Sequence, residues 1–330
     1  MNPHTSSIPH LVSVVIPVYK GELTLTNLIG EIAGFTAPAT SPGGVPWQVT
    51  EVLLVYDNGP DRSADVIRNL ARAHEFVHAV WLSGNFGQHS ATLAGMSSSN
   101  SEWIATIDED GQHNPADIGA LIDSALANYS PVVYAKPINR PPQGLLRNAA
   151  SRSAKLMISK LAVGRGTTDF QSFRLILGEI GRSVAAFSGA GVYLDVALSW
   201  VTPRISTAEV TFRDEASRSS GYSTRKLVSH FWRLVLSSGT RPLRIVTVLG
   251  ALFAVAGLAL AIVFAAQRLF GGDLPAGWTS TITVILVASG AILFSLGIIA
   301  EYVGVSINMA MGKPPYLISS DLRDGPLGRT

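Results

Sequence analysis

Two long uncharged stretches near the C-terminal end of the chain limit what it can fold into. Residues 245–266 and residues 279–300 are each 22 residues long and contain no Asp, Glu, Lys or Arg. An α-helix rises about 1.5 Å per residue, so either stretch can cross a hydrocarbon core of about 30 Å. No polar face interrupts them, which favours a transmembrane two-helix hairpin over a pair of buried core helices.

Basic residues gather on one side of this hairpin. The connection, residues 267–278, has one Arg and one Asp, whereas Lys and Arg recur just before the first stretch and after the second. Positive charge marks the cytoplasmic side of a membrane. We therefore expect a multi-pass protein of the inner (plasma) membrane with both termini in the cytoplasm.

The chain divides into four expected parts. Residues 1–222 form a cytosolic domain, and residues 223–242 form a juxtamembrane amphipathic helix that lies on the membrane, with an ordinary surface helix as the alternative. Two transmembrane helices fall within residues 243–304, and residues 305–330 form a cytosolic tail. No signal peptide is expected, because the first apolar run is short and no Lys or Arg precedes it.

Short apolar runs alternate with helical segments in the first part of the chain. The expected strands are residues 12–17, 49–56, 77–82, 103–107 and 131–135, and the expected helices are residues 23–33, 63–74, 88–97 and 115–127. This alternation predicts an α/β fold, with a mostly parallel sheet and helices on both faces. In such folds ligands bind beyond the carboxyl ends of the strands.

An acidic turn follows the expected strand at residues 103–107. Asp108 and Asp110 project to the same side because strand side chains alternate. Two carboxylates there suit a hard divalent cation, which can clamp a diphosphate and stabilise it as a leaving group. A turn without a ligand is the alternative, since Asp and Gly favour turns.

Several classes of protein are disfavoured. The chain has no Cys, which excludes disulfides and thiolate metal sites, and its net charge of +2 is no reason to expect a nucleic-acid partner. The first expected strand is not followed by Gly-x-Gly-x-x-Gly, which argues against a dinucleotide-binding oxidoreductase. Gly-Lys-Ser/Thr and Gly-x-Ser-x-Gly are also absent from the sequence, which argues against a phosphate loop and a serine hydrolase.

Five motifs follow one another in a familiar order. They are VSVVIPVYKGE from Val12, VYDNGPDRS from Val55, LSGNFGQHSATLAG from Leu82, IDEDGQHNP from Ile107 and DFQSFRLI from Asp169. In this order they resemble glycosyltransferase family 2, with its GT-A (Rossmann-like) fold. RSSGYS and TRPLR before the apolar stretches narrow the resemblance to polyprenyl-phosphate glycosyltransferases, of the dolichol-phosphate mannose synthase and undecaprenyl-phosphate glucosyl- or aminoarabinosyl-transferase type.

The resemblance implies an activity. It is the inverting transfer of one sugar from a nucleotide-sugar donor to a polyprenyl (undecaprenyl) phosphate, with Mg²⁺ or Mn²⁺, for cell-envelope glycan assembly or modification. The partners implied are the donor, the lipid phosphate and the bilayer, and a homo-oligomer is compatible with the sequence. A processive polysaccharide synthase would carry Gln-x-x-Arg-Trp and more spans, and a catalytically impaired membrane scaffold is the non-enzyme alternative.

The resemblance also implies roles for particular residues. The nucleotide-sugar would contact Pro17, Tyr19, Glu22, Asp57 and Asp108. The metal would be held by Asp108, Asp110 and Gln112, and the catalytic pair would be Asp110 and Asp169, with Asp169 orienting a reactant. The lipid phosphate would contact Arg147, Ser151 and Arg218, with Arg140 as a weaker candidate.

The chain departs from the family pattern at four places. Asp57-Asn58 replaces the usual pair of acids, Gly84 replaces an Arg, His113 replaces an acid or Asn, and Val305 replaces an Arg. For His113 a hydrogen-bonding role is favoured over metal binding. Glu109, between the two metal-site acids, has no role that the sequence assigns.

Overall fold

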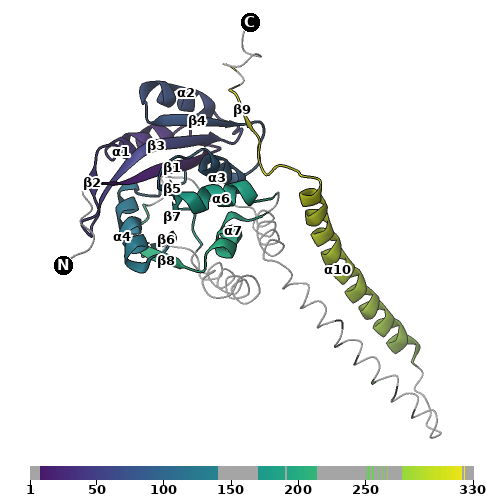
Figure 1. Ribbon diagram of the computed structural model, residues 1–330. Coiled ribbons are helices and arrows are strands. Elements are labelled where there is room, and N and C mark those ends of the chain that lie inside the picture. Colours follow the sequence, from purple (N-terminus) through teal and green to yellow (C-terminus); the bar gives the residue numbers. More distant parts are fainter. Residues whose placement is uncertain are drawn as a thin grey trace.

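A computed structural model describes residues 8–139, 170–189, 192–213, 277–321 and 323, with six isolated positions between 250 and 266. The described chain forms an α/β domain and a long helix that extends away from it (Figure 1). Several predictions fall outside the described residues. They concern Arg140, Arg147, Ser151, Asp169, Arg218 and the amphipathic helix at 223–242.

The core of the domain is a set of parallel strands. These are β5 (Trp103–Thr106), β1 (His10–Val18), β3 (Pro46–Tyr56) and β4 (Val77–Leu82), in that order across the sheet. Their apolar runs are buried on both faces, as parallel strands require. All four correspond to predicted strands, and β4 has the predicted bounds.

The remaining strands make the sheet mixed. On one side β7 (Arg174–Leu177) lies antiparallel between β5 and β6 (Val132–Pro137), and β8 (Ile205–Val210) runs parallel to β6. At the other side two short strands pair antiparallel with β3 and β4; they are β2 (Ala39–Thr40) and β9 (Ile318–Ser319). The described residues thus form a nine-stranded mixed sheet, which corrects the expectation of a mostly parallel one. The sequence missed β7 because a four-residue apolar run carries no signal of its direction.

Helices cover both faces of the sheet, as predicted. One face packs against α1 (Leu25–Ala33), α2 (Ser63–Ala73) and α4 (Ile118–Asn128), which the 3₁₀ turn η1 (Pro115–Asp117) precedes. The other face packs against α3 (Gln88–Ser97), α6 (Gly178–Phe187) and α7 (Leu194–Val201). Alternate residues of each strand pack against the two helix layers. In β1, Val14 and Ile16 face the layer of α1, α2 and α4, and Val15 faces the layer of α3, α6 and α7.

Helix α3 lies unusually close to the sheet. A Cβ atom on Gly95 would lie 2.3 Å from Val15 Cγ1 and 2.9 Å from Val55 Cγ2. Only glycine therefore permits this approach. The first residue of the same helix, Gln88, reaches the carboxyl edge of the sheet.

The long helix is α10 (Trp278–Ala310), which contains the second predicted transmembrane stretch. It extends well beyond the α/β domain, with its Ala310 end nearer to the domain than its Trp278 end (Figure 1). Among the residues that the structure describes, no helix is both long and apolar enough to cross a membrane. The membrane hairpin stays a prediction.

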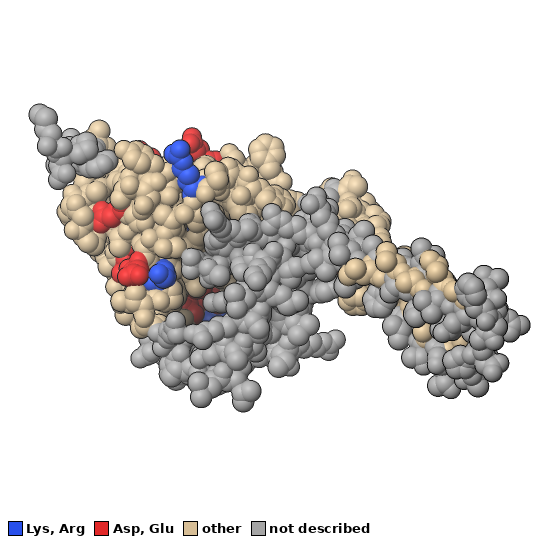
Figure 2. Space-filling model, turned by 90° about the horizontal axis from the view of Figure 1, so that it is seen from below, with Lys and Arg blue, Asp and Glu red and all other residues tan. Residues whose placement is uncertain are grey.

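Charged side chains are sparse among the described residues on the face shown in Figure 2. These Lys, Arg, Asp and Glu residues are scattered among uncharged ones, with basic and acidic groups near one another (Figure 2). Exposed ion pairs such as Arg213–Glu31 and Lys136–Glu209 belong to this pattern.

Candidate functional site

The carboxyl ends of β1, β3, β4 and β5 lie at one edge of the sheet, because these strands are parallel neighbours. The polar residues that follow them are brought together there, as predicted. Hydrogen bonds between the loops link one strand end to the next.

Glu109 joins the acidic turn to the loop after β1. Its carboxylate accepts hydrogen bonds from the backbone N–H groups of Tyr19 (2.8 Å) and Lys20 (2.8 Å). These residues are about ninety positions apart in the chain, so no local pattern could reveal the contact. Glu109, to which the sequence assigned no role, thus fixes the position of the turn that carries Asp108 and Asp110.

Asp57 organises the loop between β4 and α3. It is 3% exposed, and its two carboxylate oxygens accept hydrogen bonds from the N–H groups of Phe86 (2.7 Å) and Gly87 (2.8 Å). Burial raises the pKa of Asp57, and these two hydrogen bonds lower it in part. The neighbouring Asn58, one of the departures from the family pattern, has φ of 50° and donates a 2.6 Å hydrogen bond to the carbonyl of Leu82.

Three of the predicted nucleotide contacts lie around the loop after β1. Pro17 is buried at the end of the strand, and Tyr19 is 42% exposed. Glu22 accepts a 3.1 Å hydrogen bond from the N–H of Arg62, in the loop after β3. The two loops touch closely, since a Cβ atom on Gly59 would lie 1.6 Å from the carbonyl oxygen of Tyr19. The structure therefore gathers Pro17, Tyr19, Glu22 and Asp57 at one edge.

Asp108 is held from two sides. Gln88 Nε2, at the start of α3, donates a 2.6 Å hydrogen bond to Oδ1, and Ser172 Oγ, just before β7, donates a 2.5 Å hydrogen bond to Oδ2. Burial raises the pKa of Asp108, while Ser172, Arg174 and Gln88 lower it. The sequence reasoning missed Gln88 and Ser172, although both lie inside the quoted motifs.

Asp110 and Gln112 complete the acidic turn. The N–H of Gln112 donates a 3.0 Å hydrogen bond to Asp110 Oδ1, and Gly111 between them has φ of 77°, a conformation that favours glycine. Burial raises the pKa of Asp110, and the negative charge of Asp108 raises it further. A carboxylate whose ionisation is disfavoured by burial and by a neighbouring carboxylate is a place where a cation is stabilising.

His113 is buried beside the acidic turn and forms a hydrogen bond with its backbone. It is 3% exposed and lies between the rings of Phe173 and Phe212, with centroid distances of 5.0 and 4.8 Å. Burial lowers the pKa of His113 to about 4, so the ring is neutral and Nδ1 can accept a 3.1 Å hydrogen bond from the N–H of Asp108. This contact is the hydrogen-bonding role expected for His113.

A buried ion pair lies behind Ser172. Arg174 in β7 is 3% exposed and pairs with Asp195 of α7, which also accepts a 2.9 Å hydrogen bond from Tyr134 Oη. Arg174 Nε donates a 3.3 Å hydrogen bond to the carbonyl of Ser172. The ion pair therefore holds the backbone of the residue whose hydroxyl holds Asp108. The sequence did not point to it, because a single Arg in an apolar strand resembles a surface residue.

The acidic turn fits one kind of metal ion. Within the described ranges, no cluster of three or more His, Asp or Glu side chains is placed to hold a metal ion. Mg²⁺, however, usually binds through one or two carboxylates together with water and substrate phosphates. Asp108, Asp110 and the side-chain carbonyl of Gln112 are the oxygen ligands that Mg²⁺ or Mn²⁺ prefers. The donor set therefore fits an ion that a diphosphate helps to bind.

A mixed sheet with helices on both faces and an acidic turn at the end of a central strand is the architecture of a GT-A domain. The chain belongs to glycosyltransferase family 2, since residues 13–186 match the family described as Glycosyl transferase family 2. Residues 241–305 match a second family, the GtrB C-terminal hairpin. The resemblance seen in the motifs is confirmed.

Two relatives match nearly the whole length of the chain. The undecaprenyl-phosphate 4-deoxy-4-formamido-L-arabinose transferase of Photorhabdus laumondii is 29% identical over 317 residues, which cover 95% of this chain and 94% of the relative. The enzyme of the same name from Pectobacterium carotovorum is 30% identical, with 93% and 92% covered. Glucosyl-3-phosphoglycerate synthase from Mycobacterium tuberculosis, solved with uridine diphosphate, has a TM-score of 0.49 at 16% identity, with 70% and 80% covered.

Proposed function

We propose that the protein transfers one sugar, with inversion, from a nucleotide-sugar to undecaprenyl phosphate at the cytoplasmic face of the membrane. The observation that carries the proposal is the acidic turn at the meeting point of the strand ends, where Gln88 of α3 and Ser172 just before β7 hold Asp108, and the N–H of Gln112 bonds Asp110. Relatives named as undecaprenyl-phosphate transferases match nearly the whole chain, which supports the choice of acceptor.

The donor occupies the carboxyl edge of the sheet. Pro17, Tyr19, Glu22 and Asp57 line the side that receives the base and ribose, and Asp108, Asp110 and Gln112 lie at the diphosphate. A bound Mg²⁺ or Mn²⁺ supplies positive charge where the leaving diphosphate develops negative charge. The residues around it limit reorganisation, because Glu109 and Ser172 already fix the turn before the donor arrives.

The acceptor is a phosphate monoester, whose second pKa is about 6, so it is largely dianionic near neutrality. A strong base is not required, and Asp169 orients the donor sugar or the acceptor. Arg147, Ser151 and Arg218, with Arg140 as a further candidate, bind the phosphate, because a guanidinium offers two parallel donors to its oxygens. The phosphate oxygen then attacks the anomeric carbon in line with the departing diphosphate.

The membrane holds the two reactants together. Residues 245–266 and 279–300 cross it, residues 223–242 lie on its cytoplasmic surface, and residues 1–222 and 305–330 are cytosolic. The match to the GtrB C-terminal hairpin supports this arrangement. The product, a polyprenyl-phosphate-sugar, is then available for envelope modification.

The direct test is a donor panel. The purified full chain is incubated with undecaprenyl phosphate, Mg²⁺ or Mn²⁺ and a series of nucleotide-sugars that includes the 4-deoxy-4-formamido-L-arabinose donor, and the lipid products are weighed by mass spectrometry. We expect one donor to give a monoglycosyl lipid, and chelation with EDTA to stop the reaction. Binding of a donor without transfer to any lipid would support the scaffold alternative instead.

A further inference from the structure

The segment that follows α10 returns to the α/β domain and joins its sheet. Strand β9 pairs antiparallel with β4, with Leu82 opposite Ile318 and Trp81 opposite Ser319. Just beyond the end of β4, the N–H of Ser83 donates a 2.9 Å hydrogen bond to the carbonyl of Leu317. Without this segment the outer edge of β4 would present unpaired backbone groups to solvent.

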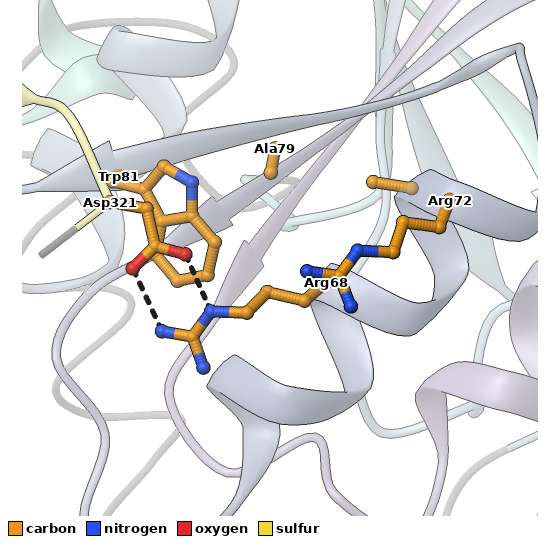
Figure 3. Close-up of a pocket in the computed structure, with 6 residues that line it drawn as sticks. Arg68, Arg72, Ala79, Trp81 and Asp321 are labelled. Atoms are coloured by element: carbon orange, nitrogen blue, oxygen red, sulfur yellow. Dashed lines mark hydrogen bonds and ion pairs between the residues drawn. The ribbon is translucent and has the colours of Figure 1, made fainter. Parts of the chain in front are cut away.

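A bidentate ion pair fastens the segment to α2. Arg68 donates to the two carboxylate oxygens of Asp321 at 2.5 and 2.8 Å, and the side chains are 12% and 7% exposed. The same guanidinium lies over the ring of Trp81, 5.0 Å from its centroid, and bonds Asp65 at 2.8 Å. Figure 3 shows Asp321 reaching across to Arg68 beside the indole of Trp81. Paired and partly buried charges of this kind contribute more than exposed ones.

A second cation near the segment provides a contrast. Arg323 bonds Asp65 at 2.6 Å, but its side chain is 68% exposed, so solvent screens the pair. Its N–H also donates a 3.1 Å hydrogen bond to Asp321, a contact that any residue at position 323 other than proline can make. The side chain of Arg323 is therefore a matched control for that of Asp321.

The docked segment lies next to the loop that serves the acidic turn. Leu82 accepts the hydrogen bond from Asn58, and Ser83 is the residue bonded to Leu317. Three residues further on, the N–H groups of Phe86 and Gly87 hold Asp57, and Gln88 then reaches Asp108. Residues 82–88 thus connect the docked segment to the acidic turn without a break.

We propose that residues 317–321 are a positioning element of the donor site, which fixes the start of the loop at residues 83–87 and through it the placement of Gln88 against Asp108. Asp321 and Arg68 are positioning residues that touch no substrate. Because only residues 311–316 separate the segment from α10, it also makes the geometry of the site depend on where that helix lies. The role in donor binding rests on the proposed function, whereas the control of the loop does not.

The test uses the full chain in lipid nanodiscs and two readouts. Hydrogen exchange is measured at residues 83–88 without any substrate, and kcat and KM for the donor are measured separately. In Asp321→Asn we expect exchange at Phe86 and Gly87 to become about tenfold faster or more, because the local opening costs less free energy. KM for the donor should rise more than kcat falls. Asp321→Glu should recover part of both effects, and Arg323→Ala should resemble the wild type.

Arg68→Lys provides a second route to the same answer. It keeps the positive charge but loses the two-pronged hydrogen bond, so it should change both readouts in the same direction by a smaller factor. If Asp321→Asn does not fold, hydrogen exchange at residues 83–88 in Arg68→Lys tests the proposal in its place. Faster exchange at β9 with unchanged exchange at residues 83–88 would overturn the proposal. A wild-type protein that transfers no sugar would overturn the proposed function, and the exchange measurement would still stand.

Discussion

Ser172 donates a 2.5 Å hydrogen bond to Oδ2 of Asp108, across 64 positions of the chain. The other oxygen of the same carboxylate accepts from Gln88 at 2.6 Å. The orientation of the Asp108 carboxylate is thus set by Gln88 of α3 and by Ser172, just before β7, which are both distant from the turn in the sequence. A carboxylate that is oriented in advance loses little freedom when a cation and a diphosphate arrive.

Replacement of Ser172 should therefore weaken the metal site without unfolding the domain. In Ser172→Ala we expect the affinity for Mn²⁺ in the presence of donor, or the rate of transfer, to fall roughly 10- to 100-fold, the usual loss when a residue that supports a metal ligand is removed. A Mn²⁺ titration of donor binding by calorimetry measures it. Ser124→Ala, whose hydroxyl bonds β8 away from the acidic turn, is the control. Equal Mn²⁺ affinity in the two variants would contradict the role of Ser172.

Asp110 should be required for transfer. Asp110→Asn keeps the size of the side chain and removes its charge, so we expect kcat to fall roughly 10²- to 10³-fold, as for other groups that stabilise charge in a transition state. Glu209→Gln, at an exposed pair with Lys136, should keep wild-type activity. A thermal melting curve checks that both variants fold. Wild-type turnover in Asp110→Asn would remove the acidic turn from the proposed mechanism.

The buried pair of Arg174 and Asp195 should matter for stability. Arg174→Met leaves the carboxylate of Asp195 in the core without its cation, which costs about 3–5 kcal/mol when one partner of a buried pair is removed. Thermal or denaturant unfolding measures the loss. The double variant Arg174→Met with Asp195→Leu should recover much of it, because no unpaired charge remains. If the double variant were as unstable as the single one, the packing of Arg174 rather than its charge would be responsible.

The contact between Asp321 and Arg68 should depend on pH in a defined direction. Hydrogen bonds from Arg68 hold the pKa of Asp321 below its ordinary value of 3.8. A carboxylate with a lowered pKa in the folded state stabilises it above the unfolded pKa, and that contribution is lost as pH falls through the folded pKa. The difference in melting temperature between the wild type and Asp321→Asn should therefore be constant above about pH 5 and shrink below about pH 4. A difference that persists unchanged at lower pH would contradict the ionic contact.

The sequence predicted the elements whose signals are local. Strand β4 and helix α3 have the predicted bounds, because turn-forming residues bound each of them in the sequence. It also placed Asp57 and Asp108 at one edge, since parallel strands end together. Strand β7 was missed because its four residues carry no local signal of its direction or of its place between β5 and β6.

The supporting residues of the site could not be predicted for a related reason. Glu109 contacts Tyr19, Ser172 contacts Asp108, and Arg174 pairs with Asp195, all between segments far apart in the chain. Each looks like an ordinary polar residue until the sheet brings its partner to it. Sequence motifs pointed to the groups that we propose contact the substrate, and the fold revealed the groups that hold them in place.

The close approach of α3 to the sheet has a consequence for natural variation in this chain. Gly95 lies two helical turns from Gln88, and a methyl group there would push the helix away from Val15 and Val55. Gln88 travels with the helix, so its contact with Asp108 would lengthen. A conservative exchange deep in the hydrophobic layer would thus inactivate the enzyme while every residue of the acidic turn remains intact, and a search for inactivating variants confined to the acidic turn would overlook it.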